Sequence, residues 1–292
     1  REGNNGGVAE VKIAGYYGDP ARAGLPRAGV AYIDERRATA YMPGAVPVLW
    51  APEAPSAEAG VVTADGKRGL FAFNNSGCPR NPQVAGHLKR RLARVRALGY
   101  GKAVLDELNY PTPHDGELFH SCFCEYCTSE EPGLEALRLK LDLGGLAAAR
   151  ARLVERALKE AADYAEALGL RLEAVVHPPI IAKLAGQDYR AFLKHVDKLQ
   201  VMLYHKCPGA GCLNKEYAML MRLTGEDPYG LGDPDKVERE GVPMWVLERE
   251  AEEARRLGGD RAVPVLWADE RLGQAMEAVA GAGFDEAVVF VP

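Results

Sequence analysis

Short apolar, β-rich runs alternate with segments of helical spacing along most of this chain of 292 residues. Alternation of this kind predicts a parallel sheet whose strands are joined and covered by helices. The helical spacing is clearest in Val84–Leu98, and a second helical pattern, residues 134–168, is expected to break at Gly144–Gly145. The expected strands are residues 11–17, 29–33, 46–50, 70–73, 103–105, 172–176, 199–204, 263–267 and 287–291, and the other expected helices are residues 189–196, 215–223, 246–257 and 272–280.

A strand count near eight favours a (β/α)8 TIM barrel with long loops at its C-terminal face. The alternative is an open doubly wound α/β sheet. No G-x-G-x-x-G motif follows a predicted strand, so the sequence favours the barrel and predicts no organic cofactor. We expect a flexible N-terminal segment over residues 1–10 and one barrel domain over residues 11–292.

Two of the predicted strands nearly repeat each other. Val46–Glu53 has the sequence V-P-V-L-W-A-P-E and Val263–Glu270 has V-P-V-L-W-A-D-E, so seven of eight positions agree. In a barrel, both strands would end at the same rim, and each would deliver a tryptophan and a glutamate there. Chance similarity between two buried strands is the other explanation.

Composition excludes several classes of protein. The chain is 47% hydrophobic and 26% charged, as is usual for a soluble globular protein, and its formal net charge is −5. No run of about 18 apolar residues occurs, so we expect no membrane-spanning helix. The negative charge argues against nucleic acid as a partner. The expectation is an enzyme or small-ligand binder, cytoplasmic or secreted after removal of a leader, and the low count of four glutamines suits a thermophile.

Cys122, Cys124 and Cys127 form a C-x-C-x-x-C motif in one predicted loop. Three thiols at this spacing can converge on one tetrahedral ion, and thiolate ligands favour zinc. The candidates for a fourth ligand are His114, His120, Cys78, Cys207 and Cys212. Four protein ligands leave no open position, so such a site would be structural. The six cysteines could instead form three disulfides or remain free.

Polar side chains follow several predicted strands, which is where a parallel barrel keeps its active site. Asp106 and Glu107 follow the buried strand 103–105, and Asp269 and Glu270 follow the strand 263–267. These four are the candidate catalytic acids, and strand alternation predicts that only one of Asp106 and Glu107 faces the barrel axis. The candidate substrate-binding residues are Trp50, Asn74, His177, Tyr204, His205 and Trp267. Acids beside aromatic platforms suit carbohydrate chemistry, in which one carboxyl group protonates the leaving oxygen and another acts as base or nucleophile.

Several segments resemble sequences of a known group of barrels. Residues 98–111, L-G-Y-G-K-A-V-L-D-E-L-N-Y-P, are similar to the pattern G-F-D-G-V-x-x-D-x-I-R-F-P, with Asp106 on its strand-end acid. The cysteine motif, residues 185–189 (A-G-Q-D-Y) and residues 196–204 (V-D-K-L-Q-V-M-L-Y) resemble further segments of the same group. The group is that of poorly characterised glycoside-hydrolase-like TIM barrels, distant relatives of chitinases and amylases. Leu108 stands where the chitinase signature has its catalytic glutamate, so the chitinase mechanism is not implied.

The leading hypothesis is a glycoside hydrolase that acts on a poly- or oligosaccharide. Asp106 and Glu107 are central to it, and the second acid comes from Asp269, Glu270 or Asp188, although Asp188 also suits a helix N-cap. The first alternative is a non-catalytic carbohydrate-binding barrel, which needs no paired acids. The second is a zinc-containing barrel enzyme of another class, because C-x-C-x-x-C also resembles the zinc site of tRNA-guanine transglycosylases. The acidic net charge argues against tRNA.

Overall fold

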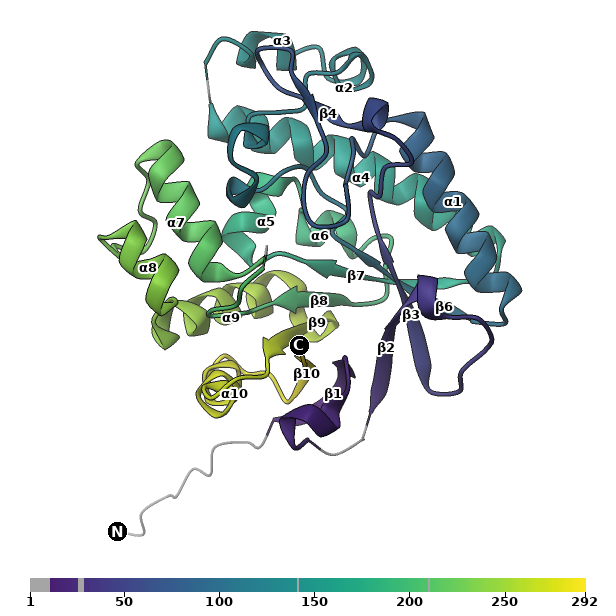
Figure 1. Cartoon of the computed structure of the whole chain (residues 1–292), viewed down its shortest axis with the longest axis vertical. Coiled ribbons are helices and arrows are strands. Elements are labelled where there is room, and N and C mark those ends of the chain that lie inside the picture. Colours follow the sequence, from purple (N-terminus) through teal and green to yellow (C-terminus); the bar gives the residue numbers. More distant parts are fainter. Residues whose placement is uncertain (1–10, 26–28, 141, 210) are drawn as a thin grey trace.

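Figure 1 shows the computed structural model of the chain, which describes residues 11–25, 29–140, 142–209 and 211–292. Eight parallel strands form a closed barrel, and β1 pairs with both β10 and β2 to complete the ring. In spatial order they are β1 (Lys12–Tyr17), β10 (Glu286–Phe290), β9 (Ala262–Trp267), β8 (Leu199–Met202), β7 (Arg171–Val176), β6 (Lys102–Asp106), β3 (Ala45–Trp50) and β2 (Val30–Asp34). The predicted TIM barrel is therefore confirmed, and closure excludes the open sheet. The predicted flexible segment 1–10 lies outside the described residues.

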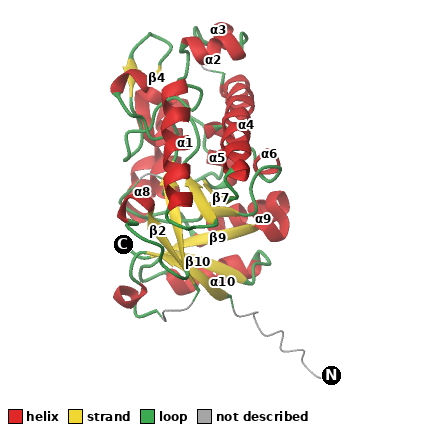
Figure 2. Cartoon of the chain, turned by 90° about the vertical axis from the view of Figure 1, so that its right-hand side faces the viewer, coloured by secondary structure: helices red, strands yellow, loops and turns green. Residues whose placement is uncertain are grey.

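Helices surround the strands (Figure 2). Helix α1 packs against β3, α4 against β7, and both α9 and α10 against β9. The helices are α1 (Pro82–Ala97), α2 (Glu125–Glu130), α3 (Leu134–Leu137), α4 (Leu143–Ala167), α5 (Pro179–Ala185), α6 (Tyr189–Phe192), α7 (Leu213–Thr224), α8 (Pro234–Glu240), α9 (Met244–Gly258) and α10 (Leu272–Gly281). The connections after β1 and β2 hold the short 3₁₀ turns η1 (Pro20–Ala23) and η2 (Glu35–Arg37), so the helical layer is thinnest there.

Two insertions extend the barrel at one end of the molecule. The first, between β3 and α1, contains η3 (Ala57–Ala59) and the two-stranded hairpin of β4 (Val61–Val62) and β5 (Arg68–Gly69). The second, between β6 and α4, contains η4 (Pro113–Phe119), α2 and α3. Both views show β4, α2 and α3 together at this end.

Some of the predicted elements are wrong in detail. Residues 70–73 form a turn closed by a bridge between Phe71 and Ser76, and the hairpin strands lie upstream of it. The helix expected over 134–168 is divided before Leu143, where the Asp142 side chain accepts a hydrogen bond from the Gly145 backbone and caps α4. The helix expected over 189–196 ends at Phe192, and α5 was not predicted.

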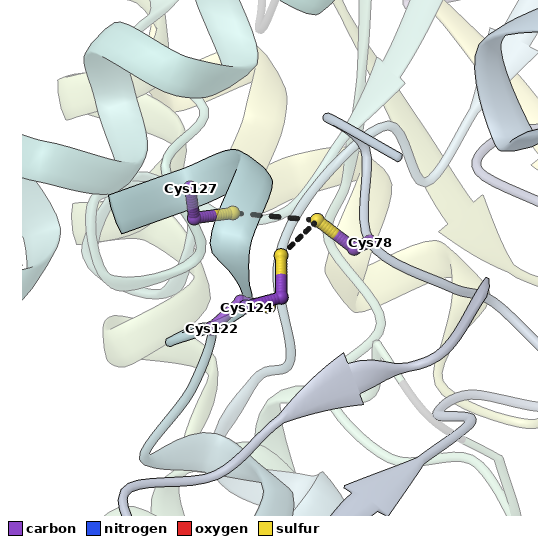
Figure 3. Close-up of side chains that lie close together, drawn as sticks. All are labelled: Cys78, Cys122, Cys124 and Cys127. Atoms are coloured by element: carbon purple, nitrogen blue, oxygen red, sulfur yellow. Dashed lines mark hydrogen bonds between the residues drawn. The ribbon is translucent and has the colours of Figure 1, made fainter. Parts of the chain in front are cut away.

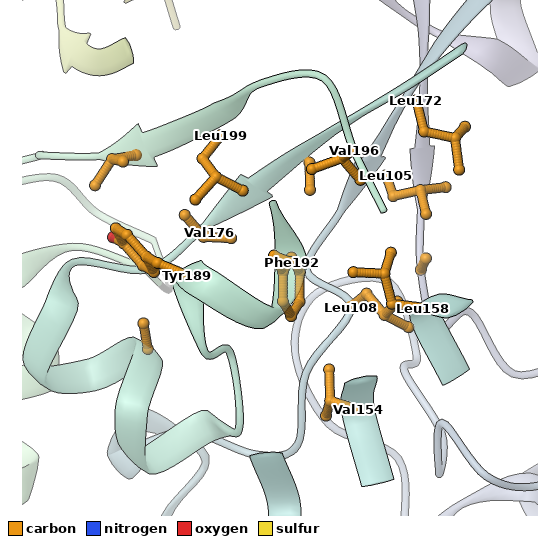
Figure 4. Packing of buried hydrophobic residues seen from close by; sticks show 14 of the residues in the cluster. Leu105, Leu108, Val154, Leu158, Leu172, Val176, Tyr189, Phe192, Val196 and Leu199 are labelled. Carbon is orange, nitrogen blue, oxygen red and sulfur yellow. The ribbon is translucent and has the colours of Figure 1, made fainter. Parts of the chain in front are cut away.

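Side chains alternate along each strand between two hydrophobic clusters. Leu105, Val176 and Leu199 point outward and pack against the helices, as Figure 4 shows around Phe192 and Leu158. The side chains before and after them point into the barrel, where Val48, Val104, Val175, Val265 and Val288 form the inner cluster. Each buried aliphatic side chain contributes about 1.5–3 kcal/mol to folding. The alternation also determines which polar side chains reach the axis.

Polar side chains also lie inside the barrel. The Tyr17 hydroxyl donates to Gln200 Oε1 at 2.7 Å, and Gln200 Nε2 donates to Glu173 Oε2 at 2.8 Å. Lys102 Nζ lies 2.8 Å from the other oxygen of Glu173. These partners satisfy a buried carboxylate inside the barrel. In the described part of the chain, no helix has the length and apolar character needed to cross a bilayer.

Candidate active site

Strand β6 ends at two adjacent acids, Asp106 and Glu107, which are each 6% exposed. Leu105 points outward, so alternation turns the Asp106 side chain toward the barrel axis. Glu107 has a φ of 58°, in the left-handed region that costs a non-glycine residue about 1–3 kcal/mol. Because this conformation breaks the regular strand at Glu107, strand alternation no longer predicts that the Asp106 and Glu107 side chains point in opposite directions.

The buried environment raises the proton affinity of both acids. Burial raises the pKa of Asp106 to about 7. Burial raises the pKa of Glu107 well above its usual value, and the neighbouring charge of Asp106 raises it further. Asp106 Oδ1 and Glu107 Oε2 have no hydrogen-bond partner among the described residues, although buried polar atoms normally have one. Two adjacent buried acids with raised pKa values suit acid–base chemistry.

His177 follows β7 and is 2% exposed. Gln187 holds its backbone, because Gln187 Oε1 accepts from the His177 amide at 2.8 Å. The Tyr189 hydroxyl donates to the His177 carbonyl at 2.6 Å. Burial lowers the pKa of His177 to about 3, so the imidazole is neutral at pH 7. Asp188 accepts from the Ala191 amide at 3.0 Å, which is the helix-cap role that the sequence offered as an alternative.

Aromatic side chains line one side of the barrel at the C-terminal ends of the strands, where Asp106 and Glu107 also lie. Backbone register aligns Trp267 with Phe290, Phe290 with Tyr17, and Tyr17 with Tyr32 across four neighbouring strands. Their rings stack with centroid separations of 4.9, 5.8 and 4.9 Å. Tyr204 meets Trp267 edge-on at 5.5 Å. We call these five residues the aromatic belt. The sequence predicted only Trp267 and Tyr204, because Tyr17, Tyr32 and Phe290 gain their position from strand register.

The belt lies beside the acids. Burial raises the pKa of Tyr204, and the charges of Asp106 and Glu107 raise it further, which places both carboxyl groups near this hydroxyl. Trp50 ends β3, pairs in register with Asp106, and is half-buried.

The other candidate acids form a separate group at the ends of β8 and β9. His205 Nε2 lies 3.4 Å from Asp269 Oδ2, and His205 is 3% exposed. Burial lowers the pKa of His205, and the charge of Asp269 opposes that change. Glu270 is exposed, and Asn74 is half-buried in the 71–76 turn. Neither Asp269 nor Glu270 is among the charges that shift the pKa of Asp106 or Glu107.

Two further acids near Glu107, the half-buried Asp115 and the buried Glu216, were not predicted from the sequence. Asp115 lies in η4 and Glu216 in α7, and the charge of each raises the pKa of Glu107. Asp115 could have been recognised in the sequence, because Thr112-Pro-His-Asp115 has the spacing of a capping box, which the structure forms. No sequence pattern distinguishes Glu216, since a glutamate in the first turn of a helix is normally solvated.

Four cysteines gather in the two insertions (Figure 3). The Sγ atoms of Cys78, Cys122, Cys124 and Cys127 all lie within 4.8 Å of one another, and all four residues are buried. Cys78, one of the candidates for a fourth ligand, completes the group. Among the described residues, Cys207 and Cys212 form a disulfide and the other four cysteines form none, so the alternative of three disulfides is wrong.

The surroundings of the four thiols suit a metal ion. Val62 N donates to Cys122 Sγ at 3.3 Å, and the Tyr110 hydroxyl lies 3.1 Å from Cys127 Sγ. Four converging sulfur atoms form the donor set of a structural tetrahedral site. His120 Nε2 lies 3.1 Å from the Leu137 carbonyl oxygen instead.

No protein-family model and no curated protein matches this sequence. Among solved structures, the glycoside hydrolase domain of PgaB (BpsB) from Bordetella bronchiseptica is similar, with 14% identity and a TM-score of 0.53 over 85% of this chain and 70% of that chain. Ega3 from Aspergillus fumigatus, in complex with galactosamine, has 10% identity and a TM-score of 0.43 over 96% and 90% of the two chains. The β-galactosidase from Rahnella sp. R3 has 11% identity and a TM-score of 0.45 over 94% of this chain and 56% of that chain. The likeness to PgaB shows the barrel fold, and the resemblance to glycoside-hydrolase barrels is confirmed at that level.

Proposed function

We propose that this protein is a glycoside hydrolase acting on a poly- or oligosaccharide at the C-terminal rim of its barrel. The observation that carries the proposal is the pair of buried acids at the end of β6, each with an unpartnered carboxylate oxygen and a raised pKa. The aromatic belt beside them supports it, because flat apolar rings suit the apolar face of a sugar.

We assign a role to each of the two acids. Glu107, whose pKa is raised by burial and by the charge of Asp106, is the general acid that protonates the glycosidic oxygen as the C–O bond breaks. Asp106, with its pKa of about 7, is ionised in part of the population and acts as nucleophile or as the base that activates water. If Asp106 is the nucleophile, water breaks the glycosyl–Asp106 ester and gives its proton to the ionised Glu107. If Asp106 is the base, it takes the proton of the attacking water, and Glu107 then regains a proton from solvent.

The predicted substrate-binding residues keep that role in this proposal. Tyr204, Trp267 and Trp50 contact sugar rings, and His177, a neutral imidazole with an unpartnered Nδ1, binds a hydroxyl group. Asn74 and His205 would also bind the sugar, and Asp269 and Glu270 are the alternative candidates for the second acid.

The test is hydrolysis of a broad panel of poly- and oligosaccharides by the wild type, Asp106→Asn and Glu250→Gln. Glu250 is the matched control, because it is also fully buried with a pKa raised to about 7 but lies among α5, α7 and α9. We expect sugar release by the wild type and Glu250→Gln, and a loss of at least about 100-fold in Asp106→Asn. Calorimetric binding without release from any substrate would favour the carbohydrate-binding barrel instead.

We also propose that Cys78, Cys122, Cys124 and Cys127 bind zinc. With four thiolates the ion would have no open position, so it would connect the two insertions and take no part in the reaction. We expect one zinc per chain by elemental analysis and none in Cys78→Ser, together with a lower Tm. Purified wild type that lacks stoichiometric zinc would contradict this assignment.

A further inference from the structure

The segment after β6 reaches the proposed metal site through Tyr110. The Tyr110 hydroxyl lies 3.1 Å from Sγ of Cys127, a residue of α2 (Figure 3), and Cys127 is its one hydrogen-bond partner among the described residues. The Tyr110 side chain is fully buried. Because a phenylalanine would fill the same space with no hydroxyl to desolvate, the hydroxyl needs a strong acceptor to offset its burial.

Cys127 is a strong acceptor only when the site holds a metal ion. A thiol accepts hydrogen bonds weakly, whereas a metal-bound thiolate carries charge and accepts a stronger bond. Four thiolates around one divalent ion leave an excess of negative charge, which is costly to bury unless donors surround it. Val62 N donates to Cys122 Sγ at 3.3 Å from the first insertion, and the Tyr110 hydroxyl is a donor from the second.

A buried cation lies against the same tyrosine ring. Arg150 Cζ is 5.6 Å from the Tyr110 ring centroid, within the range of a cation–π contact. Arg150 Nη1 donates to the Pro111 carbonyl oxygen at 3.1 Å, and Arg150 Nε donates to the Ser121 carbonyl oxygen at 2.9 Å. One positive charge therefore contacts both the segment of Tyr110 and the residue that precedes the cysteine motif.

Backbone contacts hold Tyr110 independently of its hydroxyl. Tyr110 N donates to the carbonyl oxygen of Ala185 at the end of α5, at 2.9 Å, and Asn109 Nδ2 donates to the Tyr110 carbonyl oxygen at 2.7 Å. In sequence, Tyr110 follows Asp106 and Glu107 closely. The hydroxyl thus adds one contact between the cysteine group and the segment that follows the candidate acids.

We propose that Tyr110 is a positioning residue of the metal centre, whose hydroxyl donates to the metal-bound Cys127 thiolate and connects the metal to the strand end that carries Asp106 and Glu107. The inference rests on the proposed zinc site. A partner that hydrogen-bonds to a metal ligand orients that ligand and strengthens metal binding. Loss of the metal would replace the charged acceptor by a weak one and remove a restraint on residues 107–111.

The test uses the full chain loaded with Co²⁺, whose thiolate-to-metal charge-transfer absorption reports on the sulfur ligands. In Tyr110→Phe we expect Co²⁺ affinity to fall by about 10–100-fold in competition with a chelator. The absorption should also move to lower energy, because a thiolate that loses a hydrogen bond donates electrons more readily. Tyr100→Phe is the matched control, since Tyr100 is 2% exposed and its hydroxyl donates to the Ala40 carbonyl oxygen at 3.1 Å instead. It should change neither quantity.

Hydrogen exchange tests the connection to the strand end. In the Co²⁺-loaded proteins, the amides of residues 107–111 should exchange faster in Tyr110→Phe than in the wild type or Tyr100→Phe. Equal exchange in all three would overturn that connection. Unchanged Co²⁺ affinity together with an unchanged spectrum in folded Tyr110→Phe would overturn the inference as a whole.

A measurement on the wild type keeps the inference testable if Tyr110→Phe does not fold. In ¹¹³Cd-substituted protein, a proton that hydrogen-bonds to a metal-bound sulfur couples to the cadmium nucleus, so both the Val62 amide and the Tyr110 hydroxyl should show this coupling. Coupling at Val62 without coupling at Tyr110 would overturn the inference.

Failure of this inference can be distinguished from failure of the proposed function. A wild type that binds neither Co²⁺ nor Cd²⁺ at the four cysteines would overturn the metal assignment and the role of Tyr110, while the hydrolysis test of Asp106 would stand. A protein that shows the expected Tyr110→Phe effects but hydrolyses no saccharide would support the inference while the glycosidase proposal fails.

Discussion

Arg150 is the most fully buried cation described in the protein, at 1% exposure, and replacing it should be severely destabilising. Its guanidinium donates hydrogen bonds to the carbonyl oxygens of Ser121, Pro111, Leu184 and Phe119. Burial lowers the pKa of Arg150 to about 10, so the group keeps its charge at neutral pH. A single side chain from α4 thus holds the cysteine loop, the segment after β6 and the end of α5.

The magnitude follows from what Arg150→Met would leave behind. Four buried carbonyl oxygens would lose a charged donor, and each buried acceptor left without a partner costs about 1–3 kcal/mol. Relaxation and water entry would satisfy some of them, so we expect a loss of about 4 kcal/mol in the free energy of unfolding. Methionine keeps the apolar stem but also loses the cation–π contacts of the guanidinium, whose Cζ lies 5.6 Å from the Tyr110 ring centroid and 5.3 Å from that of Phe119.

The assay is urea denaturation of the wild type, Arg150→Met and Arg152→Met. Arg152 is the matched control, because it lies on the same helix and pairs with Glu131 at 2.7 Å but is 53% exposed. An exposed ion pair contributes about 0–1 kcal/mol, so Arg152→Met should be nearly neutral. Equal and small losses in the two variants would refute the reasoning.

Three other predictions follow from the site and the buried acids. Glu107→Gln should lower kcat by about 10²–10⁴-fold on a natural glycoside and much less on an aryl glycoside, whose leaving group needs no proton; equal losses would contradict its role as acid. Trp267→Ala should weaken oligosaccharide binding by about tenfold in calorimetry, whereas Trp245→Ala, an exposed tryptophan on α9, should not change it. Burial raises the pKa of Glu250 from 4.5 to about 7. Because this folded value lies above the unfolded one, its protonation favours the folded state, so the free energy of unfolding should fall from about pH 4.5 to pH 7 and Glu250→Gln should flatten that dependence in urea melts.

Local patterns were enough to predict the barrel and the acids at its rim. The strand 103–105 is apolar and short, and it ends directly in Asp106, so alternation and the parallel-barrel rule together indicate a side chain at the rim. The Cys122–Cys127 motif was equally local. Both predictions needed only neighbours in sequence.

Features that depend on contacts between distant segments were not predictable in this way. Cys78 joins the other thiols from 44 residues upstream of Cys122, and the sequence could offer it only as one of five candidates. Glu216 reaches Thr112 across 104 residues, and nothing in the first turn of α7 distinguishes it from a solvated glutamate. Residues 70–73 were mistaken for a strand because they are apolar, but Phe71 is buried in the core at a turn and Phe73 is 66% exposed.

The repeated strand sequence shows how the barrel assigns different roles to identical segments. β3 and β9 both have the sequence A-V-P-V-L-W, and in the closed order four steps separate them, so they lie on opposite sides of the barrel. Beyond the strands the environments diverge, since Glu53 forms an ion pair with Arg91 at 2.7 Å whereas Glu270 is exposed. Arg91 also donates to the Trp50 carbonyl oxygen at 2.6 Å and so fixes the end of β3. The two copies of the repeat therefore form equivalent strands, but their glutamates lie in different environments. The difference arises after the strands, because α1 supplies Arg91 as a partner for Glu53.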